Sequence, residues 1–300
     1  MESNKEQPET QKSWYDKWYL VLLTIPVIIL ILSLIYLGTF YSKHGDFINK
    51  DVSLSGGTTI TLNLNNIDSD KLESSLKPKF PDITIRKLTG METGEQLALI
   101  VESSASPDEL KPAIEEFLNL KLTDENSSVE FTGSTLSSSF YKQLITALII
   151  AFILMSIVIF ILFRTFIPSI AVIFAAFSDI IMALAFVNIL GLKISAAGIA
   201  AFLMLVGYSV DTDILLTTRA LKKAEGKLNE RIYSAFKTGI LMTITALAAI
   251  LPAFFIIKGL PDSFKQIFLI LAVGLSADII NTWLTNAGII KIYCDKKGIK

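Results

Sequence analysis

The sequence predicts an α-helical membrane protein with six transmembrane helices and an α+β ferredoxin-like extracytoplasmic domain inserted between the first helix and the second. Of the 300 residues, 52% are hydrophobic and 18% are charged, which is too apolar for an ordinary soluble domain. Six separate apolar runs reach the roughly 20 residues that a membrane-spanning helix needs. One long polar segment, 42–140, follows the first run and has the pattern of a folded α/β unit.

The first apolar run, 18–41, is predicted to be a retained membrane anchor. Residues 1–17 before it are polar and are expected to form a cytoplasmic tail. The run is longer than the apolar region of a signal peptide, and no small-residue cleavage site follows it. The remaining part of the bundle, 141–290, contains the other five predicted spans, at 142–163, 168–190, 194–217, 238–258 and 266–290. Residues 291–300 are expected to form a second cytoplasmic tail.

The distribution of Lys and Arg predicts the orientation, because cytoplasmic loops carry an excess of both residues. With the N-terminus in the cytoplasm, fourteen Lys and Arg residues lie on the cytoplasmic side, whereas the short outer loops hold Lys193, Lys258 and Lys265. Segment 42–140 carries nine Lys and Arg against sixteen Asp and Glu. We therefore predict a multi-pass protein of the cytoplasmic membrane with both termini in the cytoplasm.

Segment 42–140 contains short strand and helix patterns in the order βαββαβ. The first helix, 68–79, has Asp68 or Ser69 as its N-cap. The second helix opens with Ser106 as N-cap, Pro107 at the first helical position and Glu109 completing a capping box. This order is that of a ferredoxin-like sandwich, in which two helices cover one face of an antiparallel sheet. The expected strands are 58–64, 82–88, 96–101 and 129–132, with a turn at 90–94.

Several classes of function lack the residues that they need. A net charge of -1 gives no basic field for nucleic acid. The single histidine, His44, has no metal-ligand companions, and the single cysteine, Cys294, cannot form an internal disulfide. The Gly-Gly stretch at 56–57 lacks the Lys and the spacing of a phosphate loop. We therefore expect no enzyme, no metal, no cofactor and no nucleic-acid partner.

Four aspartates inside the predicted spans are the most informative residues. Burying a charge there costs roughly 2.5–3.5 kcal/mol, so such residues are functional candidates. Asp179 and Asp278 are expected near the middle of their helices. Asp211 and Asp213 lie two residues apart on the fourth helix, so their side chains point to nearly opposite faces. Each of the four is either a protonatable group in a conduction path or a polar staple between helices.

Two further features leave their roles open. Asp278 heads a polar stripe that either packs against other helices or lines a hydrated path; its other members are Asn281, Thr282, Thr285 and Asn286. Lys237, at the start of the fifth helix, is either an interfacial lysine or a counter-charge near Asp211.

Four stretches resemble the SecF family of protein-export membrane proteins, within the resistance-nodulation-division (RND) superfamily. They run from Ser55 to Thr58, from Phe131 to Ser137, from Gly207 to Asp213 with Arg219 after it, and from Lys237 to Gly239. With the six-helix layout, the resemblance covers nearly the whole chain. In bacterial members the signature aspartate, which is preceded by an Asn, occupies the position after that of Asp211. In this sequence that position is Thr212. Asp211 instead matches an aspartate of the partner family SecD, so the sequence resembles the archaeal branch.

The resemblance implies an auxiliary subunit of the Sec translocase. Such a subunit would work with a SecD-like membrane subunit and a SecY-type channel to export polypeptides, using the proton gradient. The resemblance also implies Asp211 as the leading proton-relay residue with Lys237 as its partner, and it favours Asp179 as a further candidate. The rival predictions are an RND-type exporter of small molecules or lipids, and a membrane-anchored scaffold or binding module.

A second six-helix subunit is also expected from polarity. One bundle should bury only some of the intramembrane aspartates and the polar stripe against itself, and the remainder would need a partner.

Overall fold

The computed structural model describes residues 14–64, 67–89, 95–221, 226–256 and 262–299. Within these residues, six spans are long and apolar enough to cross a membrane, which confirms the predicted fold class. The last span is an α-helix, a π-helical segment and a second α-helix in succession. The spans are α1 (Trp14–His44), α5 (Ser134–Phe163), α6 (Phe166–Ile189), α7 (Ala196–Leu221), α8 (Leu228–Ile256), and α9 (Asp262–Ile280) with η1 (Asn281–Asn286) and α10 (Ala287–Lys297).

Three helix boundaries differ from those expected. Helix α5 begins at Ser134, inside segment 42–140, and α8 begins at Leu228 instead of 238. The last span continues to Lys297, so the expected tail 291–300 is mostly helical. In each case the extra turns are rich in polar residues, whereas hydropathy detects only the apolar part of a helix. The expected tail 1–17 overlaps α1 from Trp14, and its residues 1–13 lie outside the described residues.

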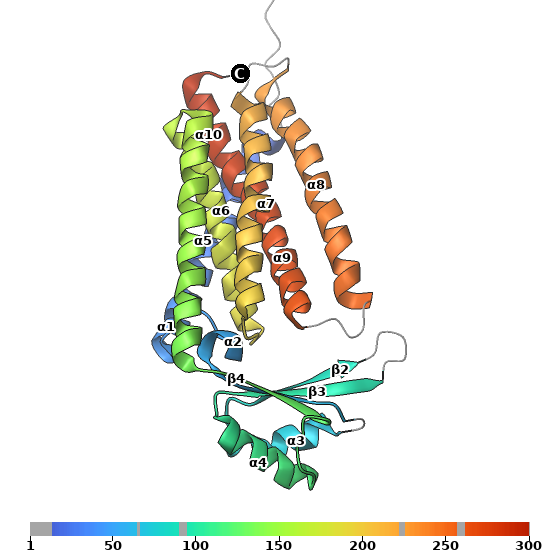
Figure 1. The fold of residues 1–300 in the computed structure, drawn as a ribbon. Helices are drawn as coiled ribbons and strands as arrows, with labels where there is room; N and C mark the ends of the chain where they lie inside the picture. The colour runs from blue at the N-terminus through green and yellow to red at the C-terminus, as the bar shows by residue number, and fades with distance from the viewer. Residues whose placement is uncertain (1–13, 65–66, 90–94, 222–225, 257–261, 300) are drawn as a thin grey trace, which may run out of the picture.

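The inserted domain has the predicted βαββαβ order and sheet. Its four strands form one antiparallel sheet in the order β2-β3-β1-β4. Helices α3 and α4 cover the face of the sheet that points away from the membrane bundle (Figure 1). The expected turn 90–94 lies outside the described residues. The elements are β1 (Gly57–Leu62), α3 (Ser69–Leu76), β2 (Thr84–Thr89), β3 (Gln96–Ser103), α4 (Pro107–Leu118) and β4 (Ser127–Thr132).

The caps and the core explain why this domain folds. Asp68 caps α3 by accepting hydrogen bonds from the main-chain N–H groups of Asp70 and Lys71. Ser106 and Glu109 form the predicted capping box at α4. The apolar faces of both helices then pack on the inward-facing residues of the sheet. The fully buried members of this core are Ile60, Leu62, Leu72, Leu99, Val101, Leu110 and Ile114.

The Gly-Gly stretch has a steric role where the domain meets the bundle. A short helix, α2 (Val52–Ser55), ends at Gly56 with φ +86°, and Gly57 follows with φ +141°. A Cβ atom at Gly56 would lie 2.5 Å from the Cα atom of Ser134, and one at Gly57 would lie 2.3 Å from the carbonyl oxygen of Ser103. Only glycine tolerates both this backbone geometry and this crowding. The two residues therefore let β1 start directly against β3 and against the first turn of α5.

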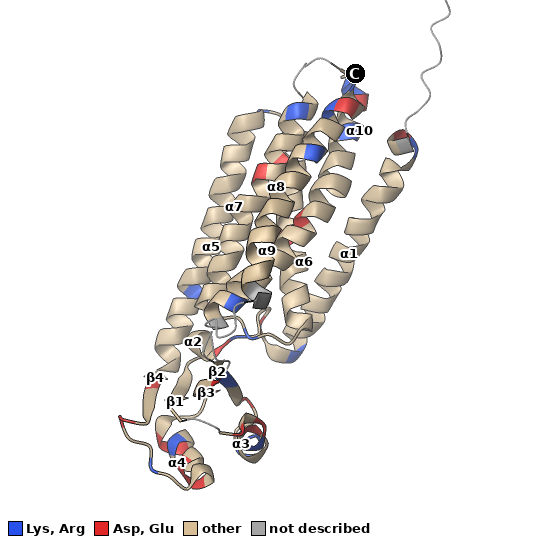
Figure 2. Cartoon of the chain, turned by 90° about the vertical axis from the view of Figure 1, so that its right-hand side faces the viewer, with Lys and Arg blue, Asp and Glu red and all other residues tan. Residues whose placement is uncertain are grey.

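Helices α6, α7 and α9 form the centre of the bundle. They supply most of its buried apolar core, which includes Val187, Phe202 and Ile270. Helices α5 and α8 are far more exposed and lie at its periphery. Most Lys and Arg residues lie near the two ends of the bundle, whereas acidic residues occur at its middle depth (Figure 2). The three central helices therefore bring the interior acidic residues together.

Candidate functional site

Three aspartates from the three central helices meet inside the bundle. Asp179 comes from α6, Asp213 from α7 and Asp278 from α9, and each is 0% exposed. Buried charged groups in a membrane helix occur almost only where they have a function or a partner. We call Asp179, Asp213 and Asp278 the carboxylate trio.

Asp179 forms the end of the trio that lies closest to the inserted domain. Its Oδ2 atom accepts a hydrogen bond from the Ser209 hydroxyl of α7. Its Oδ1 atom accepts one from the Asn281 amide at 2.6 Å, and the same amide lies 3.5 Å from the Met182 sulfur. Asp179 is thus held by α7 and by η1, the segment that follows α9.

Asp278 and Asp213 share one threonine hydroxyl. The Thr282 Oγ1 atom lies 2.9 Å from the Oδ1 atom of Asp278 and 2.9 Å from the Oδ1 atom of Asp213. Thr212 Oγ1 lies 3.0 and 3.1 Å from the two carboxylate oxygens of Asp278. The Asn286 amide donates to Asp213 Oδ1 at 2.7 Å. Oxygen atoms therefore form a continuous hydrogen-bonded path from Asp278 through Thr282 to Asp213.

The π-helical segment η1 presents this polar surface. A π-helix widens the chain locally and is often found at functional sites. Five of the six residues in η1 are buried: Trp283 and the four polar residues Asn281, Thr282, Thr285 and Asn286. The four polar residues are the stripe that the sequence placed after Asp278, and the structure packs them against α6 and α7 inside one bundle. One bundle therefore buries the whole stripe, and Asp211 is the predicted intramembrane aspartate that it leaves exposed.

Several oxygen atoms around Asp213 are buried without a hydrogen-bond partner among the described residues. They are the Asp213 Oδ2, Asn286 Oδ1, Thr217 Oγ1 and Thr285 Oγ1 atoms. Asp213 and Thr217 are one helical turn apart on α7, so these groups extend the polar interior from the trio toward the end of the bundle opposite the domain. In the part of the chain that the structure describes, no group of three or more His, Cys, Asp and Glu residues has the geometry to hold a metal ion.

The trio has no basic neighbour among the described residues. The recorded partners of the three carboxylates are hydroxyl and amide groups. Arg219, the basic residue closest in sequence, donates instead to Ser234 at 2.7 and 3.0 Å and to Thr238 at 3.0 Å on α8. Three uncompensated negative charges in such a site would be strongly unfavourable.

The structure separates Asp211 and Lys237 from the trio. Asp211 is exposed on α7, on the same side as the exposed residues Met204 and Tyr208. Lys237 is also exposed, and its ammonium lies 4.8 Å from the ring centroid of Tyr233. No contact between Asp211 and Lys237 is recorded among the described residues. Of the five candidates from the sequence, the structure brings together Asp179, Asp213 and Asp278.

Ser209 and Thr212 were missed as parts of the site. Hydroxyl residues are common in membrane helices because they can bond to their own backbone, so neither residue stands out in the sequence. The available signal was their spacing: Ser209, Thr212 and Asp213 lie at i, i+3 and i+4, on one face of a helix.

Comparison with known proteins identifies the family. Residues 114–296 match the family described as "Protein export membrane protein SecD/SecF, C-terminal". The chain is 39% identical over 283 residues to the protein-export membrane protein SecF of Methanocaldococcus jannaschii, covering 92% of this chain and 96% of that protein. The chain belongs to the SecD/SecF family.

A second relative agrees with this assignment, and a solved structure has the same fold. The chain is 36% identical over 277 residues to the SecF protein of Pyrococcus furiosus, covering 92% of this chain and 91% of that protein. The crystal structure of SecDF, a translocon-associated membrane protein from Thermus thermophilus, superposes with a TM-score of 0.72 at 19% identity. That match covers 95% of this chain and 39% of the SecDF chain, so nearly all of this chain shares the fold of less than half of SecDF.

Proposed function

We propose that the chain is an auxiliary subunit of the Sec protein translocase, which assists polypeptide export across the cytoplasmic membrane by using the proton gradient together with a SecD-like subunit. Relatives that match over nearly their whole length are named protein-export membrane proteins. The observation that carries the mechanism is the trio, which joins three helices through hydroxyl and amide groups in an apolar bundle. The subunit conducts protons and changes shape, and it performs no chemistry on its client.

The shared hydroxyl of Thr282 supports proton transfer. A hydroxyl group has one proton to donate and two lone pairs that accept. When Asp278 is protonated and Asp213 is ionised, Asp278 donates to Thr282 and Thr282 donates to Asp213. Transfer of both protons along these two bonds leaves Asp278 ionised, Thr282 unchanged and Asp213 protonated. The 2.9 Å distances on both sides of Thr282 suit this exchange.

The positions of Asp213 and Asp179 suit exchange with opposite sides of the membrane. Asp213 lies seventeen residues after Ala196, the first residue of α7, which places it about 26 Å from the domain end of that helix. Asp179 lies ten residues before the domain end of α6, at a depth of about 15 Å. The positive-inside rule supports a cytoplasmic position for the end of the bundle opposite the domain, where both termini then lie.

The exposed faces of α7 and α8 suit contact with the SecD-like partner. Asp211 and Tyr208 are polar groups on an otherwise apolar exposed face of α7, and Lys237 is exposed on α8. A partner bundle would bury these groups away from lipid, and it would allow Asp211 and Lys237 to join a proton path at the interface. The heteromeric complex would then contact a SecY-type channel and the exported polypeptide.

Export of a reporter with and without the proton gradient tests the proposal. Asp179→Asn, Asp213→Asn and Asp278→Asn keep the shape of the side chain but remove the transferable proton. We expect each to reduce export to the level seen with a collapsed gradient, while the protein still assembles. Asp211→Asn, on the exposed face, tests separately whether a proton path at the partner interface contributes to export. If all three buried variants export normally under a gradient, the trio is a structural staple and the proposed mechanism is wrong.

A further inference from the structure

The loop between α6 and α7 joins the inserted domain to all three helices that carry the trio. Its backbone pairs with residues 49–51, which lead from α1 into the domain. The Ile194 N–H donates to the Asn49 carbonyl at 2.7 Å, and the Asp51 N–H donates to the Ile194 carbonyl at 3.0 Å. At the end of α6, the Asn188 amide donates to the Phe47 carbonyl at 2.7 Å. The loop is therefore fixed to the segment that leads into the domain.

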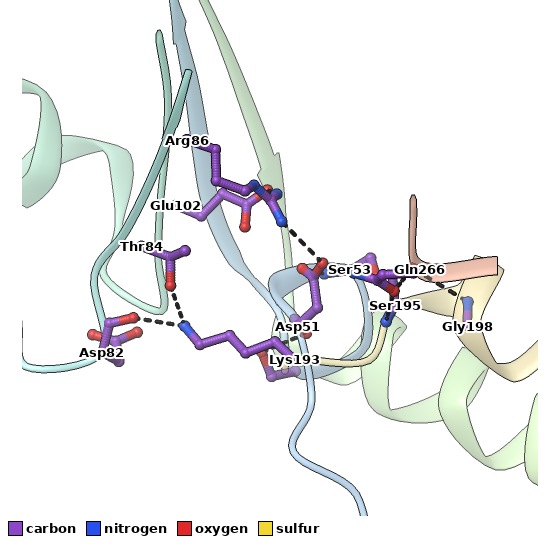
Figure 3. A network of polar contacts seen from close by, with 11 residues as sticks. Asp51, Ser53, Asp82, Thr84, Arg86, Glu102, Lys193, Ser195, Gly198 and Gln266 are labelled. Atoms are coloured by element: carbon purple, nitrogen blue, oxygen red, sulfur yellow. Dashed lines mark hydrogen bonds and ion pairs between the residues drawn. The ribbon is translucent and has the colours of Figure 1, made fainter. Parts of the chain in front are cut away.

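Lys193 extends this junction to the sheet of the domain. Its ammonium donates to the Asp82 main-chain carbonyl at 2.8 Å and to the Thr84 hydroxyl at 2.6 Å, at the start of β2. Figure 3 shows Lys193 reaching across from the bundle to this strand. These are two direct side-chain bonds between a loop of the membrane bundle and the α/β domain.

A second contact of the same loop ties α7 to α9. The Gln266 Oε1 atom of α9 accepts hydrogen bonds from the Ser195 N–H at 2.9 Å and from the Ser195 hydroxyl at 2.7 Å (Figure 3). The Ser195 oxygen in turn lies 3.4 Å from the N–H of Gly198, in the first turn of α7. The packing leaves no room for a side chain at Gly198, because a Cβ atom there would lie 2.7 Å from the Ile194 side chain. The start of α7 is thus held in register with α9.

On the domain side, Arg86 makes the junction continuous with the sheet. It bonds to Glu102 of β3 and lies 4.0 Å from the Asp51 carboxylate. The other oxygen of Asp51 caps α2 by accepting from the Ser53 N–H at 3.1 Å. The sheet, α2 and the loop therefore form one connected polar network (Figure 3).

We propose that Lys193 is a positioning residue that couples the relay to the inserted domain, so that the hydrogen-bonding state of the trio sets how the domain sits on the bundle. This inference rests on the proposed function. Asp213 and Asp278 lie on α7 and α9, and Ser195 and Gln266 join these two helices at the domain end. Because Ser195 and Gln266 hold these helices together at the domain end, a shift of α7 against α9 at the trio acts on this contact and on the loop that carries Lys193.

The alternative is that Lys193 only stabilises the junction. The two roles differ in what a Lys193→Met variant does to the response of the domain. A coupling residue transmits a change at the trio, whereas a stabilising residue alters the domain position without affecting that response. Allosteric couplings of this kind are typically worth about 5- to 150-fold in an equilibrium.

Distance measurements between two spin labels test the coupling in the full chain. The labels are placed on cysteines that replace Lys87 of β2 and Ser263 of α9, which are both exposed, in a Cys294→Ala background with the SecD-like partner. Asp278→Asn mimics the protonated carboxyl. We expect it to change the ratio between the populations in the distance distribution by about fivefold or more. With Lys193→Met added, the Asp278→Asn shift should disappear. Lys79→Met, which removes an exposed lysine that pairs with Glu116 at 3.7 Å in the same domain, should preserve it.

A second readout separates this inference from the proposed function. In sealed vesicles, Lys193→Met should retain proton flux while losing gradient-driven export, because the trio is intact and only its link to the domain is removed. If Lys193→Met exports normally or leaves the Asp278→Asn shift unchanged, the coupling role is wrong and the proposed function stands. If the trio variants themselves export normally, the proposed function fails.

Discussion

Replacing Thr282 by Val tests the relay at the one hydroxyl that two carboxylates share. Valine keeps the branched shape of threonine and removes the group that lies 2.9 Å from both Asp278 and Asp213. Thr285, three residues along the same segment, is equally buried, but its hydroxyl has no partner among the described residues. Thr285→Val is therefore a matched control on the same turn of η1.

The expected effects on stability are small. Interhelical hydrogen bonds in membrane proteins contribute on average about 0.6 kcal/mol and at most about 1.7 kcal/mol. Thr282→Val removes two hydrogen bonds and should therefore lower the free energy of unfolding by about 1.2 kcal/mol at this average value. Asp213 keeps Asn286 and Asp278 keeps Thr212 as partners. Thr285→Val should be neutral or slightly stabilising, since a buried hydroxyl without a partner is unfavourable.

The expected effect on transport is large, because the path between Asp278 and Asp213 loses the only hydroxyl that bridges them among the described residues. Proton uptake and reporter export are measured in vesicles that contain the partner subunit. Thr282→Val should reduce both to the level without a gradient, Thr282→Ser should restore both, and Thr285→Val should resemble the wild type. Normal proton uptake in Thr282→Val would refute the path, whatever its effect on stability.

Three further predictions concern the domain, the linker and the topology. In a denaturant titration of the isolated domain 55–133, Leu99→Ala should lower the free energy of unfolding by about 2–5 kcal/mol, because Leu99 is 0% exposed. Leu97→Ala is the control and should have little effect, because Leu97 is 55% exposed. Burial raises the pKa of Asp46, but hydrogen bonds from Lys50 and Tyr141 outweigh this effect and hold the pKa below its ordinary value. The stabilisation by Asp46 is therefore full above the ordinary carboxyl pKa of about 3.9 and is lost as the pH falls through the pKa of the folded state. The unfolding temperatures of Asp46→Asn and of the wild type should therefore become equal at low pH. A membrane-impermeant thiol reagent should label Ser75→Cys on intact cells and Lys296→Cys only after permeabilisation, and the reverse pattern would invert the orientation.

The helices and the domain were predictable because their signals are local. A membrane span is detected by roughly 20 apolar residues, and the domain by alternating strands and by the caps at Asp68 and Ser106. The ends of α5, α8 and α10 were not predictable by hydropathy, because their outer turns are polar. The short helix α2 also had no clear pattern, since it consists of four residues between a linker and a Gly-Gly pair.

The composition of the site was only partly predictable. The sequence showed that Asp211 and Asp213 point to opposite sides of α7, because two residues rotate the helix by about 200°. It did not show which side is the interior, since both sides of α7 also carry apolar residues. Packing decides this: Thr212 and Asp213 face η1 and α9, and Asp211 is left outside.

The burial of the trio changes the reason for expecting a partner subunit. The stripe from Asp278 to Asn286 is buried inside one bundle, so it offers no exposed polar surface that association would cover. Asp211 is different, because it lies fifteen residues into α7, which has 26 residues, and therefore about 22 Å from the domain end. An exposed carboxylate at that depth would cost roughly 2.5–3.5 kcal/mol in lipid. Association with a second bundle over Tyr208 and Asp211 would remove this cost, so the proposed partner contact and the proposed relay lie on opposite faces of the same helix.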